Sequence, residues 1–325
     1  MQLNFGIEGL FFNKSLSADV NYFYTKNYDL VTNLNNSTPD LLGYTITANN
    51  NAFIDNGLEY TLRYTKEVND DLKFAIGHSL IYATGKVDKL DEPIYPADAQ
   101  QRVRTGESRF AMFGLTADGL YGVSDFNPDG TLSASLPTPT FGSVQPGDIK
   151  YIDVNNDGII DDDDQSIIGN SRADFQYSVD LKVSFKQFDF YVLGIGQNGQ
   201  DKYRNNSYFW AYGDLKYSET ALDAYGPNNL NVNASMPRLS STRNNNNYRN
   251  SSFWLYKSNY FIIPTMQLSY NFKPGFSKVF KDLRFFVKGN NLININKNKD
   301  IDELRFGAGS TPFTKGFSLG LVTSF

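Results

Sequence analysis

One acidic segment of the sequence has the residue types and spacing of a calcium-binding loop. Asp153, Asn155 and Asp157 place side-chain oxygens at positions one, three and five of such a loop, and Gly158 permits its tight turn. A hard cation prefers about six to eight oxygen ligands, and this spacing can wrap them around one point. The predicted metal ligands are Asp153, Asn155, Asp157, Ile159 (through its backbone carbonyl), Asp161 and Asp164.

The last ligand position bears on which cation the loop would hold. Asp164 stands where such loops usually carry a bidentate Glu, which predicts a weaker or smaller site. We expect Ca²⁺ ahead of Mg²⁺, and we expect no organic cofactor. No flanking helices are evident, so the segment 153–164 is interpreted as a calcium-type loop outside an EF-hand. A solvated acidic turn without metal is the alternative.

The remaining residues that could do chemistry argue against an enzyme. The chain has no Cys and a single His, His78, which excludes thiolate and multi-His metal sites and leaves no evident nucleophile–base pair. Gly194, Gly196 and Gly199 have dinucleotide-loop spacing, but polar loop residues follow them where that motif needs a helix. We interpret them as a strand end, and His78 as a residue in a girdle or interstrand position. A net charge of −5 argues against a nucleic-acid partner.

The elements that must position these residues are predicted to be strands. The chain contains 26 Phe and 21 Tyr yet has a mean hydropathy of −0.42, so it is aromatic but polar overall, unlike a disordered chain. Apolar and polar residues alternate with the period of a β-strand, most clearly over 173–185. Similar runs fall at 3–11, 16–25, 57–66, 72–82, 187–197, 260–272, 282–293 and 313–325.

The length of these runs favours membrane strands over soluble ones. They run to about 9–13 residues, whereas the mean soluble strand has about 5–6 and a tilted membrane strand needs about 9–11. No stretch approaches the roughly 18 apolar residues of a transmembrane helix, and the first residues lack the features of a signal peptide.

The connections alternate between short and long, as in outer-membrane barrels with short periplasmic turns and long extracellular loops. All short turns fall on the periplasmic side only if the connection 83–172 crosses the membrane an even number of times or not at all. We therefore assign 107–122 to a folded extracellular excursion, and about nine strands then span the membrane. The sequence therefore predicts an all-β, antiparallel transmembrane β-barrel segment whose barrel is incomplete. The short connections lie near 12–16, 66–71, 186–187 and 273–281, and the long ones cover 26–56, 83–172, 198–259 and 294–312.

Other interpretations stay open on the residues alone. The same alternation fits a soluble sandwich, here a secreted carbohydrate-binding module with a calcium loop, and a passive porin is a further alternative. The long loop 198–259 is rich in Tyr, Asn and Trp. These side chains could stack on sugars or peptides, or they could simply pack the loop.

Several stretches of the sequence resemble segments of one protein family, and they occur in the same order as in that family. They are NNAFIDNGLEYTLRY; GDIKYIDVNNDGIIDDDDQSIIGNSRADFQYSVDLKVSFKQFDFYVLGIGQNG; SFWLYKSNYFIIPTMQLSYNF; LRFFVKGNNLININK; and the final strand to Phe325. Over nearly its whole length (1–325) the chain resembles the C-terminal part of SusC-like (RagA-type) TonB-dependent transporters of the Bacteroidetes outer membrane. The residues Asp153, Asn155, Asp157, Asp161 and Asp164 fall on that family's acidic loop.

The resemblance implies an outer-membrane importer of oligosaccharides or peptides. Its expected partners are a SusD-like surface lipoprotein, the TonB complex, the lipid bilayer and the barrel assembly machinery, which would read the alternating strand that ends at Phe325. The sequence departs from the family because it has no plug domain, TonB box or signal peptide. Family barrels have about 22 strands, so the strands predicted here would be part of a larger wall.

Overall fold

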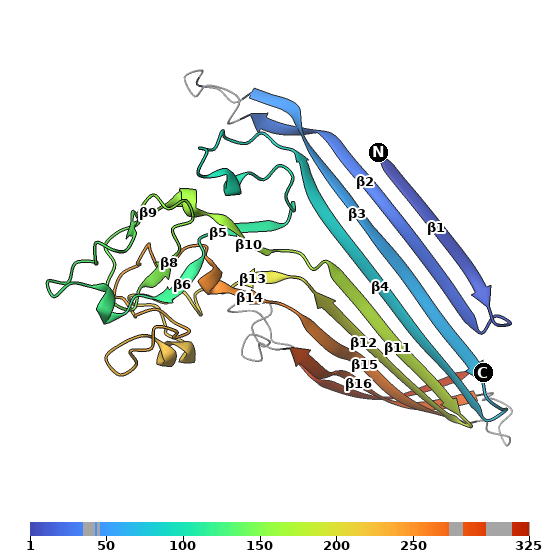
Figure 1. Ribbon diagram of the computed structural model, residues 1–325. Coiled ribbons are helices and arrows are strands. Elements are labelled where there is room, and N and C mark those ends of the chain that lie inside the picture. The colour runs from blue at the N-terminus through green and yellow to red at the C-terminus, as the bar shows by residue number, and fades with distance from the viewer. Residues whose placement is uncertain (35–42, 44–45, 273–281, 297–313, 325) are drawn as a thin grey trace.

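The computed structural model describes residues 1–34, 43, 46–272, 282–296 and 314–324. Its main feature is a 9-stranded sheet in the order β1-β2-β3-β4-β11-β12-β15-β16-β17, with every neighbouring pair antiparallel (Figure 1). The prediction of an all-β, antiparallel barrel segment of about nine long strands, with the barrel incomplete, is confirmed. The strands are β1 (Gln2–Phe11), β2 (Leu16–Leu34), β3 (Ile46–Glu67), β4 (Leu72–Lys89), β11 (Phe175–Phe185), β12 (Phe188–Asn198), β15 (Tyr260–Phe272), β16 (Asp282–Asn296) and β17 (Gly316–Ser324).

Three strands extend far past the alternating runs that predicted them, each by more than five residues. β2 has 19 residues, β3 has 22 and β4 has 18. The added length lies beyond the apolar alternation, where Asn33 pairs with Thr47 and Leu34 with Ile46. Backbone pairing alone carries the ladder here, because a strand that leaves the apolar zone no longer needs one apolar face. The alternating pattern therefore predicts the apolar part of these strands, but it does not predict where the strands end.

Short turns join the strands at one end of the sheet. Phe12, Asn13 and Lys14 have positive φ values of 53°, 56° and 70°, and Ser15 N–H donates to the Phe12 carbonyl over 3.1 Å. Lys186, with φ of 54°, helps to close the hairpin between β11 and β12. Figure 1 shows these turns at the end opposite the two long excursions. The predicted turn 273–281 and the terminal Phe325 lie outside the described residues.

The two long excursions, residues 90–174 and 199–259, make up what we call the excursion module. The predicted segment 107–122 lies here, where β5 pairs with β10 and β6 with β8, outside the large sheet. All helices among the described residues are 3-10 turns, and none of them is long and apolar enough to cross a membrane. The module's elements are η2 (Gln100–Arg102), β5 (Ala111–Gly114), β6 (Ala117–Leu120), η3 (Val123–Asp125), β7 (Thr138–Pro139), β8 (Ile149–Tyr151), β9 (Ile159–Ile160), η4 (Asp162–Asp164), β10 (Ser166–Asn170), β13 (Asp201–Tyr203), η5 (Glu219–Asp223), η6 (Ser252–Trp254) and β14 (Leu255–Lys257).

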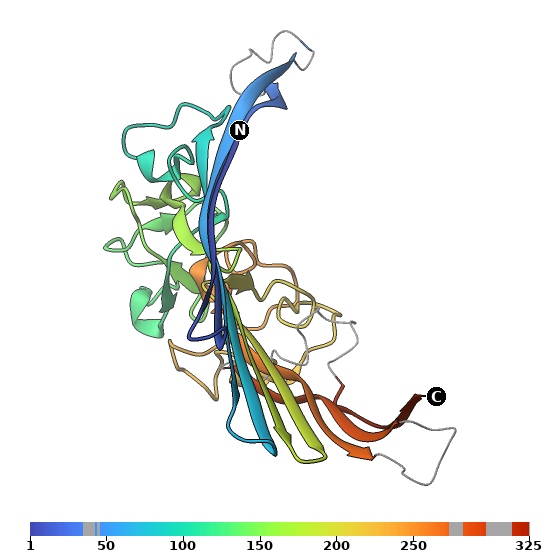
Figure 2. The same ribbon diagram turned by 90° about the vertical axis from the view of Figure 1, so that its right-hand side faces the viewer.

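The contiguous cluster of buried apolar residues lies in this module, while the large sheet contributes separate buried positions such as Val87 and Ile262. Both excursions contribute to a single cluster, with Tyr151 from the first and Trp254 from the second each about fully buried. The sheet itself is a curved single layer when seen from its side (Figure 2). Within the described ranges no second large sheet packs against it. The alternative of a two-sheet sandwich is therefore wrong, because a sandwich requires the apolar rows of two sheets to meet in a dry interior.

Candidate functional site

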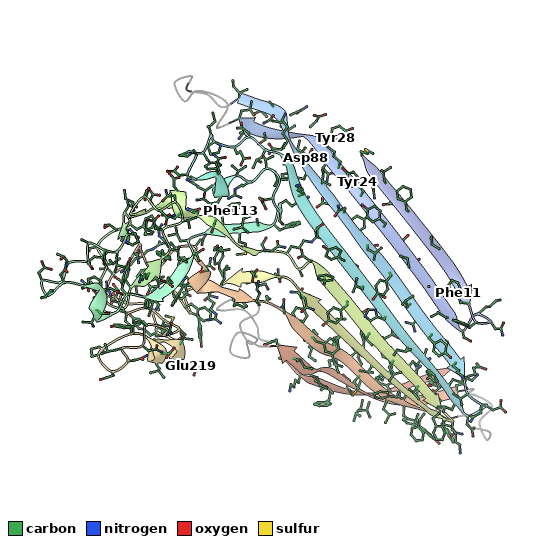
Figure 3. The ribbon with its side chains drawn as sticks, in the orientation of Figure 1. Phe11, Tyr24, Tyr28, Asp88, Phe113 and Glu219 are labelled. Carbon is green, nitrogen blue, oxygen red and sulfur yellow. The ribbon has the colours of Figure 1, made fainter. Side chains whose placement is uncertain are left out.

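One face of the sheet carries continuous apolar rows, which we call the outer face. Cross-strand pairing aligns Ile7 with Val20, Val20 with Tyr60, and Tyr60 with Leu80. These side chains stay accessible, and Ile7 is 77% exposed. Apolar area left in water costs roughly 25 cal/mol per Å², so a surface of this extent marks a membrane or a partner. Figure 3 shows side chains along the strands, with Phe11 of β1 and Tyr24 of β2 labelled among them.

The glycines with dinucleotide-loop spacing have a packing role on the outer face. A Cβ on Gly194 would lie 2.3 Å from the Phe261 ring, and one on Gly196 would lie 2.4 Å from the Tyr177 ring. Without side chains at these positions, the Tyr177 and Phe261 rings stack across β12 at 6.1 Å. β12 ends at Asn198 and leads into a loop, so the strand-end interpretation holds and no helix offers its N-terminus to a pyrophosphate.

His78 also lies among the outer-face residues. Its ring stacks on Tyr60 with the centroids 5.4 Å apart, and in the ladder it pairs with Leu62 and Val179. The structure therefore places it in an interstrand position, one of the two positions predicted for it.

The opposite face, the inner face, is polar and partly ion-paired across strands. Arg63 on β3 reaches over β4 to Asp180 on β11, with Nη2 to Oδ1 at 2.8 Å. The residue between them is Gly77, where a Cβ would lie 2.3 Å from the Asp180 carboxylate. The absence of a side chain at that position leaves room for a two-strand salt bridge. One face that suits hydrocarbon and one that suits water is the arrangement of a membrane barrel wall.

A buried polar junction ties the two excursions into one module. Asp148, with 0% exposure, accepts hydrogen bonds from Asn247 Nδ2 at 2.8 Å and Asn244 Nδ2 at 3.1 Å, and pairs with Arg238 Nε at 2.7 Å. Asn247 Oδ1 in turn accepts from the Ile149 N–H at 2.8 Å. A buried carboxylate needs this degree of pairing, because an uncompensated charge in the interior is costly. The sequence shows the Asn-rich run but carries no signal for its distant partner.

The aromatic residues of 198–259 mostly pack inside the module. Trp210, Tyr248 and Trp254 form a cluster with ring centroids about 6 Å apart, and Tyr248 and Trp254 are buried. The Trp254 indole N–H donates to the Asn247 carbonyl at 2.7 Å. These three rings therefore serve the core, and of the two interpretations of this segment they support packing.

The predicted metal loop is closed by hydrogen bonds from its own backbone. Asp153 accepts from the N–H groups of Asn156 and Gly158 at 2.6 and 2.8 Å, and Asp157 accepts from Ile159 N–H at 2.8 Å. Asp164, fully buried, accepts from the N–H groups of Val154 at 2.7 Å and Asp161 at 2.9 Å. Burial raises the pKa of the Asp164 carboxyl in spite of these hydrogen bonds.

As described, the loop side chains do not converge on one point. In the ranges that the structure covers, no group of three or more His, Cys, Asp or Glu side chains is placed to hold a metal ion. The residues thus do not fit a bound cation until some of their carboxylates turn away from the backbone, and calcium binding stays a prediction.

Arginine side chains pair with some of the acidic residues of the loop and not with others. Asp162 lies 3.8 Å from Arg249, and Asp163 is paired with Arg102. Neither Asp162 nor Asp163 is one of the predicted metal ligands. Salt bridges to the predicted ligand carboxylates, those of Asp153, Asp157, Asp161 and Asp164, are absent from the described part of the chain.

Comparison with known proteins shows which proteins this chain is similar to. No protein-family model matches the chain. Its sequence is 22% identical to TonB-dependent receptor P3 of Formosa agariphila over 100% of the chain, and 26% identical to receptor P26 of that organism over 99%. It is 19% identical over 99% of the chain to TonB-dependent receptor SusC of Bacteroides thetaiotaomicron. The resemblance to SusC-like TonB-dependent receptors is confirmed.

The chain spans about a third of the length of these receptors, with coverage of 34%, 34% and 31%. Among solved structures, the fold is similar to the RagAB peptide transporter, with a TM-score of 0.70 and 18% identity over 100% of this chain and 35% of that one. The RagAB peptide importer in its open-open state gives a TM-score of 0.71 at 17% identity, covering 100% of this chain and 34% of that one. The described sheet is similar to part of the RagAB peptide transporter and is not closed on itself.

Proposed function

We propose that the chain forms part of the wall of an outer-membrane, TonB-dependent importer of oligosaccharides or peptides. The observation that carries this proposal is the single-layer sheet with an exposed apolar outer face and a polar inner face. Lipid would contact the outer face and hydrophilic cargo would pass along the inner one. TonB-dependent receptors are transporters, and the chain is accordingly proposed to have no catalytic role.

The two edge strands constrain what completes the wall. Backbone amides cannot stay unpaired in hydrocarbon, so β1 and β17 each need a strand partner. Because the antiparallel sheet has 9 strands, its two edges run in the same direction. An odd number of further strands is needed to close it with antiparallel pairs throughout. A barrel of about 22 strands meets that condition.

The excursion module is proposed to face outward, with the short turns on the periplasmic side. That orientation follows the asymmetry of outer-membrane barrels. A SusD-like surface lipoprotein would then meet the module, as the likeness to SusC supports. Energy from the TonB complex would arrive through the plug domain of such a receptor.

Detergent dependence tests the proposal at the level of the chain. An exposed apolar wall should keep the purified chain monodisperse only in detergent or lipid, and aggregation is expected in plain buffer. A folded, monodisperse chain in plain buffer would contradict a membrane role and favour a secreted module.

Uptake tests the transport itself. Deleting the gene in its own bacterium should abolish import of some oligosaccharide or peptide, and deleting TonB should have the same effect. Import that persists without TonB would favour the passive porin instead.

A further inference from the structure

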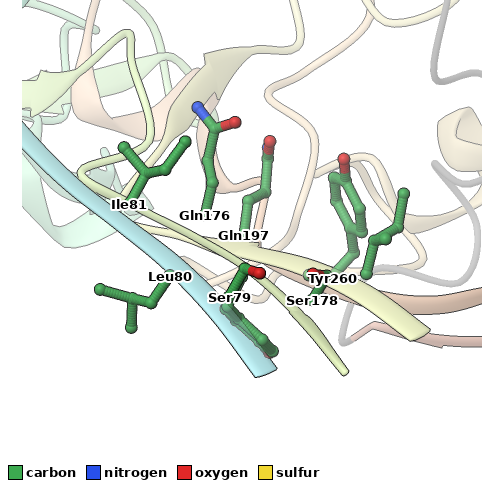
Figure 4. A pocket seen from close by; sticks show the side chains of 10 residues that line it. Ser79, Leu80, Ile81, Gln176, Ser178, Gln197 and Tyr260 are labelled. Carbon is green, nitrogen blue, oxygen red and sulfur yellow. The ribbon is translucent and has the colours of Figure 1, made fainter. Parts of the chain in front are cut away.

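A hollow of about 280 Å³ lies on the inner face of the sheet, close to the excursion end, and we call it the inner-face groove. Figure 4 shows Ile81, Gln176, Gln197 and Tyr260 projecting on one side of the strands, while Leu80 projects on the other. The inner-face residues that line the groove are Ser79, Ile81, Gln176, Ser178, Ile195, Gln197 and Tyr260.

Strand register explains why the wall is hollowed at this point. Pairing across four strands aligns Ile81 with Gln176, Gln176 with Gln197, and Gln197 with Tyr260 in one row of long side chains. The next row toward the short turns pairs Ser79 with Ser178. Two short hydroxyl side chains beside a row of long ones leave space above the backbone, and the groove is that space.

The polar groups of the groove are arranged for a ligand that both donates and accepts hydrogen bonds. Gln197 Nε2 donates to Gln200 Oε1 at 2.7 Å and to the Ser258 carbonyl at 3.2 Å, which fixes the carboxamide. That anchoring leaves Gln197 Oε1 as an oriented acceptor. The Gln176 carboxamide lies on an exposed residue and provides both a donor and an acceptor. Groups held in place before binding lose less entropy when a ligand arrives.

The groove lining carries no charged side chain. The nearby Arg63 and Asp180 charges compensate each other across Gly77. At the end of the glutamine row, Glu59 pairs with Ile81 and adds a negative charge. A charged ligand would lose hydration here without a counter-charge in the lining, and an anionic one would also be repelled.

We propose that the inner-face groove binds a neutral oligosaccharide during its passage along the wall. Sugar hydroxyls both donate and accept, which matches Gln176, Gln197 and the two serines. The Tyr260 ring at one end of the row offers an apolar surface for the C–H face of a pyranose, and Ile81 lines the opposite end. The inference rests on the proposed transport function and narrows its cargo to uncharged glycans.

Binding to the full 325-residue chain tests the groove directly. The chain is held in micelles of an amine-oxide detergent, because maltoside headgroups would compete for a sugar site. The probes are maltohexaose, cellohexaose and xylohexaose, with an acetylated and amidated Gly-Ser hexapeptide as the uncharged peptide, and saturation-transfer NMR and titration calorimetry report binding. At least one hexasaccharide should bind, and Gln176→Ala or Gln197→Ala should weaken it about 3- to 10-fold, the range for loss of one hydrogen bond.

Two further variants keep the result interpretable. Gln267→Ala removes a glutamine from the inner face of β15, outside the groove, and should leave affinity unchanged. Ser178→Trp fills the hollow while both glutamines stay, and should abolish binding. The inference is overturned if the peptide binds and the hexasaccharides do not, if neither binds, or if Gln267→Ala weakens binding as much as the groove variants.

Uptake by cells separates this inference from the proposed function. Cells that import a neutral oligosaccharide equally well with wild-type and Gln176→Ala/Gln197→Ala protein would retain the transporter and refute the groove. Cells whose TonB-dependent import of every peptide and glycan is unaffected by gene deletion would refute the transport function itself.

Discussion

Asn247 donates from Nδ2 to Asp148 Oδ1 over 2.8 Å, with both side chains at 0% exposure. The two residues come from different excursions of the chain, so this hydrogen bond crosses between them. Asn247 Oδ1 also accepts from the Ile149 N–H at 2.8 Å, beside Asp148. The module at one end of the sheet is therefore a folded unit in which neither excursion completes its polar pairing alone.

Replacing Asn247 with Ala should destabilise the excursion module strongly. The change removes one of the hydrogen bonds to the buried Asp148 carboxylate and leaves the Ile149 N–H without its acceptor. We expect a loss of about 2–4 kcal/mol in the free energy of unfolding, because buried polar groups are left unsatisfied. Urea unfolding followed by tryptophan emission measures this loss, since both Trp residues of the chain, Trp210 and Trp254, lie in the module.

Asn245→Ala is the matched control, because Asn245 belongs to the same Asn run but is exposed. Its free energy of unfolding should change by less than about 0.5 kcal/mol, as for an ordinary surface substitution. Equal effects of the two substitutions would show that the buried junction does not join the excursions.

The salt bridge between Arg63 and Asp180 should contribute modestly to the wall. The Arg63 side chain is 46% exposed, so solvent screening limits the coupling to about 0.5–1 kcal/mol. A double-mutant cycle with Arg63→Gln and Asp180→Asn measures it by thermal unfolding in detergent, and the value should fall as salt is raised.

Gly77→Ala should destabilise the sheet by much of the coupling energy of this salt bridge, without removing a charge. Its Cβ would lie 2.3 Å from Asp180 Oδ1 and 2.9 Å from Arg63 Nη2, so the pair must separate. The pair of Lys73 and Glu67, at 50% and 67% exposure beside a turn, is the control and should show almost no coupling. An unchanged melting temperature for Gly77→Ala would contradict the role given to that glycine.

The start of the first excursion should loosen in acid through Glu92. Burial alone would raise the pKa of the Glu92 carboxyl, but hydrogen bonds from the Thr105 hydroxyl and the N–H groups of Arg104 and Thr105 hold that pKa below its usual value. A carboxyl whose folded pKa is depressed stabilises the fold above its unfolded pKa of about 4.3, and this contribution is lost as pH falls through the folded pKa.

Hydrogen exchange at the Arg104 and Thr105 amides reports this change. Protection should be high at neutral pH and should fall as pH drops through the depressed folded pKa of Glu92. Glu92→Gln should show weak protection at every pH, while Glu107→Gln should behave as wild type. Acid-insensitive protection in the wild-type chain would disprove the role of the Glu92 carboxylate.

The large sheet could be predicted because its signal is local. Each spanning strand repeats an apolar residue at every second position, and this pattern alone assigns Phe175, Tyr177 and Val179 to one face. The extensions of β2 and β3 past this zone gave no such signal, since backbone pairing there does not require an apolar face.

The excursion module could not be predicted in the same way, because its contacts are distant in sequence. Asp148 belongs to no motif, and its partner Asn247 is 99 residues away. The inner-face groove likewise depends on register: Gln176 and Gln197 become neighbours only because the β11–β12 hairpin pairs them directly. Sequence spacing identified the acidic loop, but it could not separate the positions that pair with arginine from those that do not.

Calcium binding by the acidic loop should depend on which of these positions is changed. Asp157 is a predicted ligand whose carboxylate, among the described residues, accepts from Ile159 N–H and the Asn155 side chain of its own loop, whereas the Asp162 carboxylate lies 3.8 Å from Arg249 Nη1. If Ca²⁺ binds, it must draw the ligand carboxylates off the backbone N–H groups, so affinity should be weak, in the range of extracellular sites of about 10⁻⁴–10⁻³ M. Titration calorimetry of the detergent-held chain should give heat in this range, and Asp157→Asn should weaken binding at least about tenfold through loss of a charged ligand.

Asp162→Asn is the matched control, because it removes the same charge from the same loop at a position that faces Arg249. If the loop coordinates calcium by the predicted spacing, this variant should keep wild-type affinity within about twofold, a difference of some 0.4 kcal/mol. If calcium instead responds only to the loop's total charge, the two variants should weaken binding equally. Absence of heat from Ca²⁺ and Mg²⁺ up to millimolar concentration would leave the loop as a turn held by its own hydrogen bonds, which is how the carboxylates of Asp153 and Asp164 are engaged in the structure.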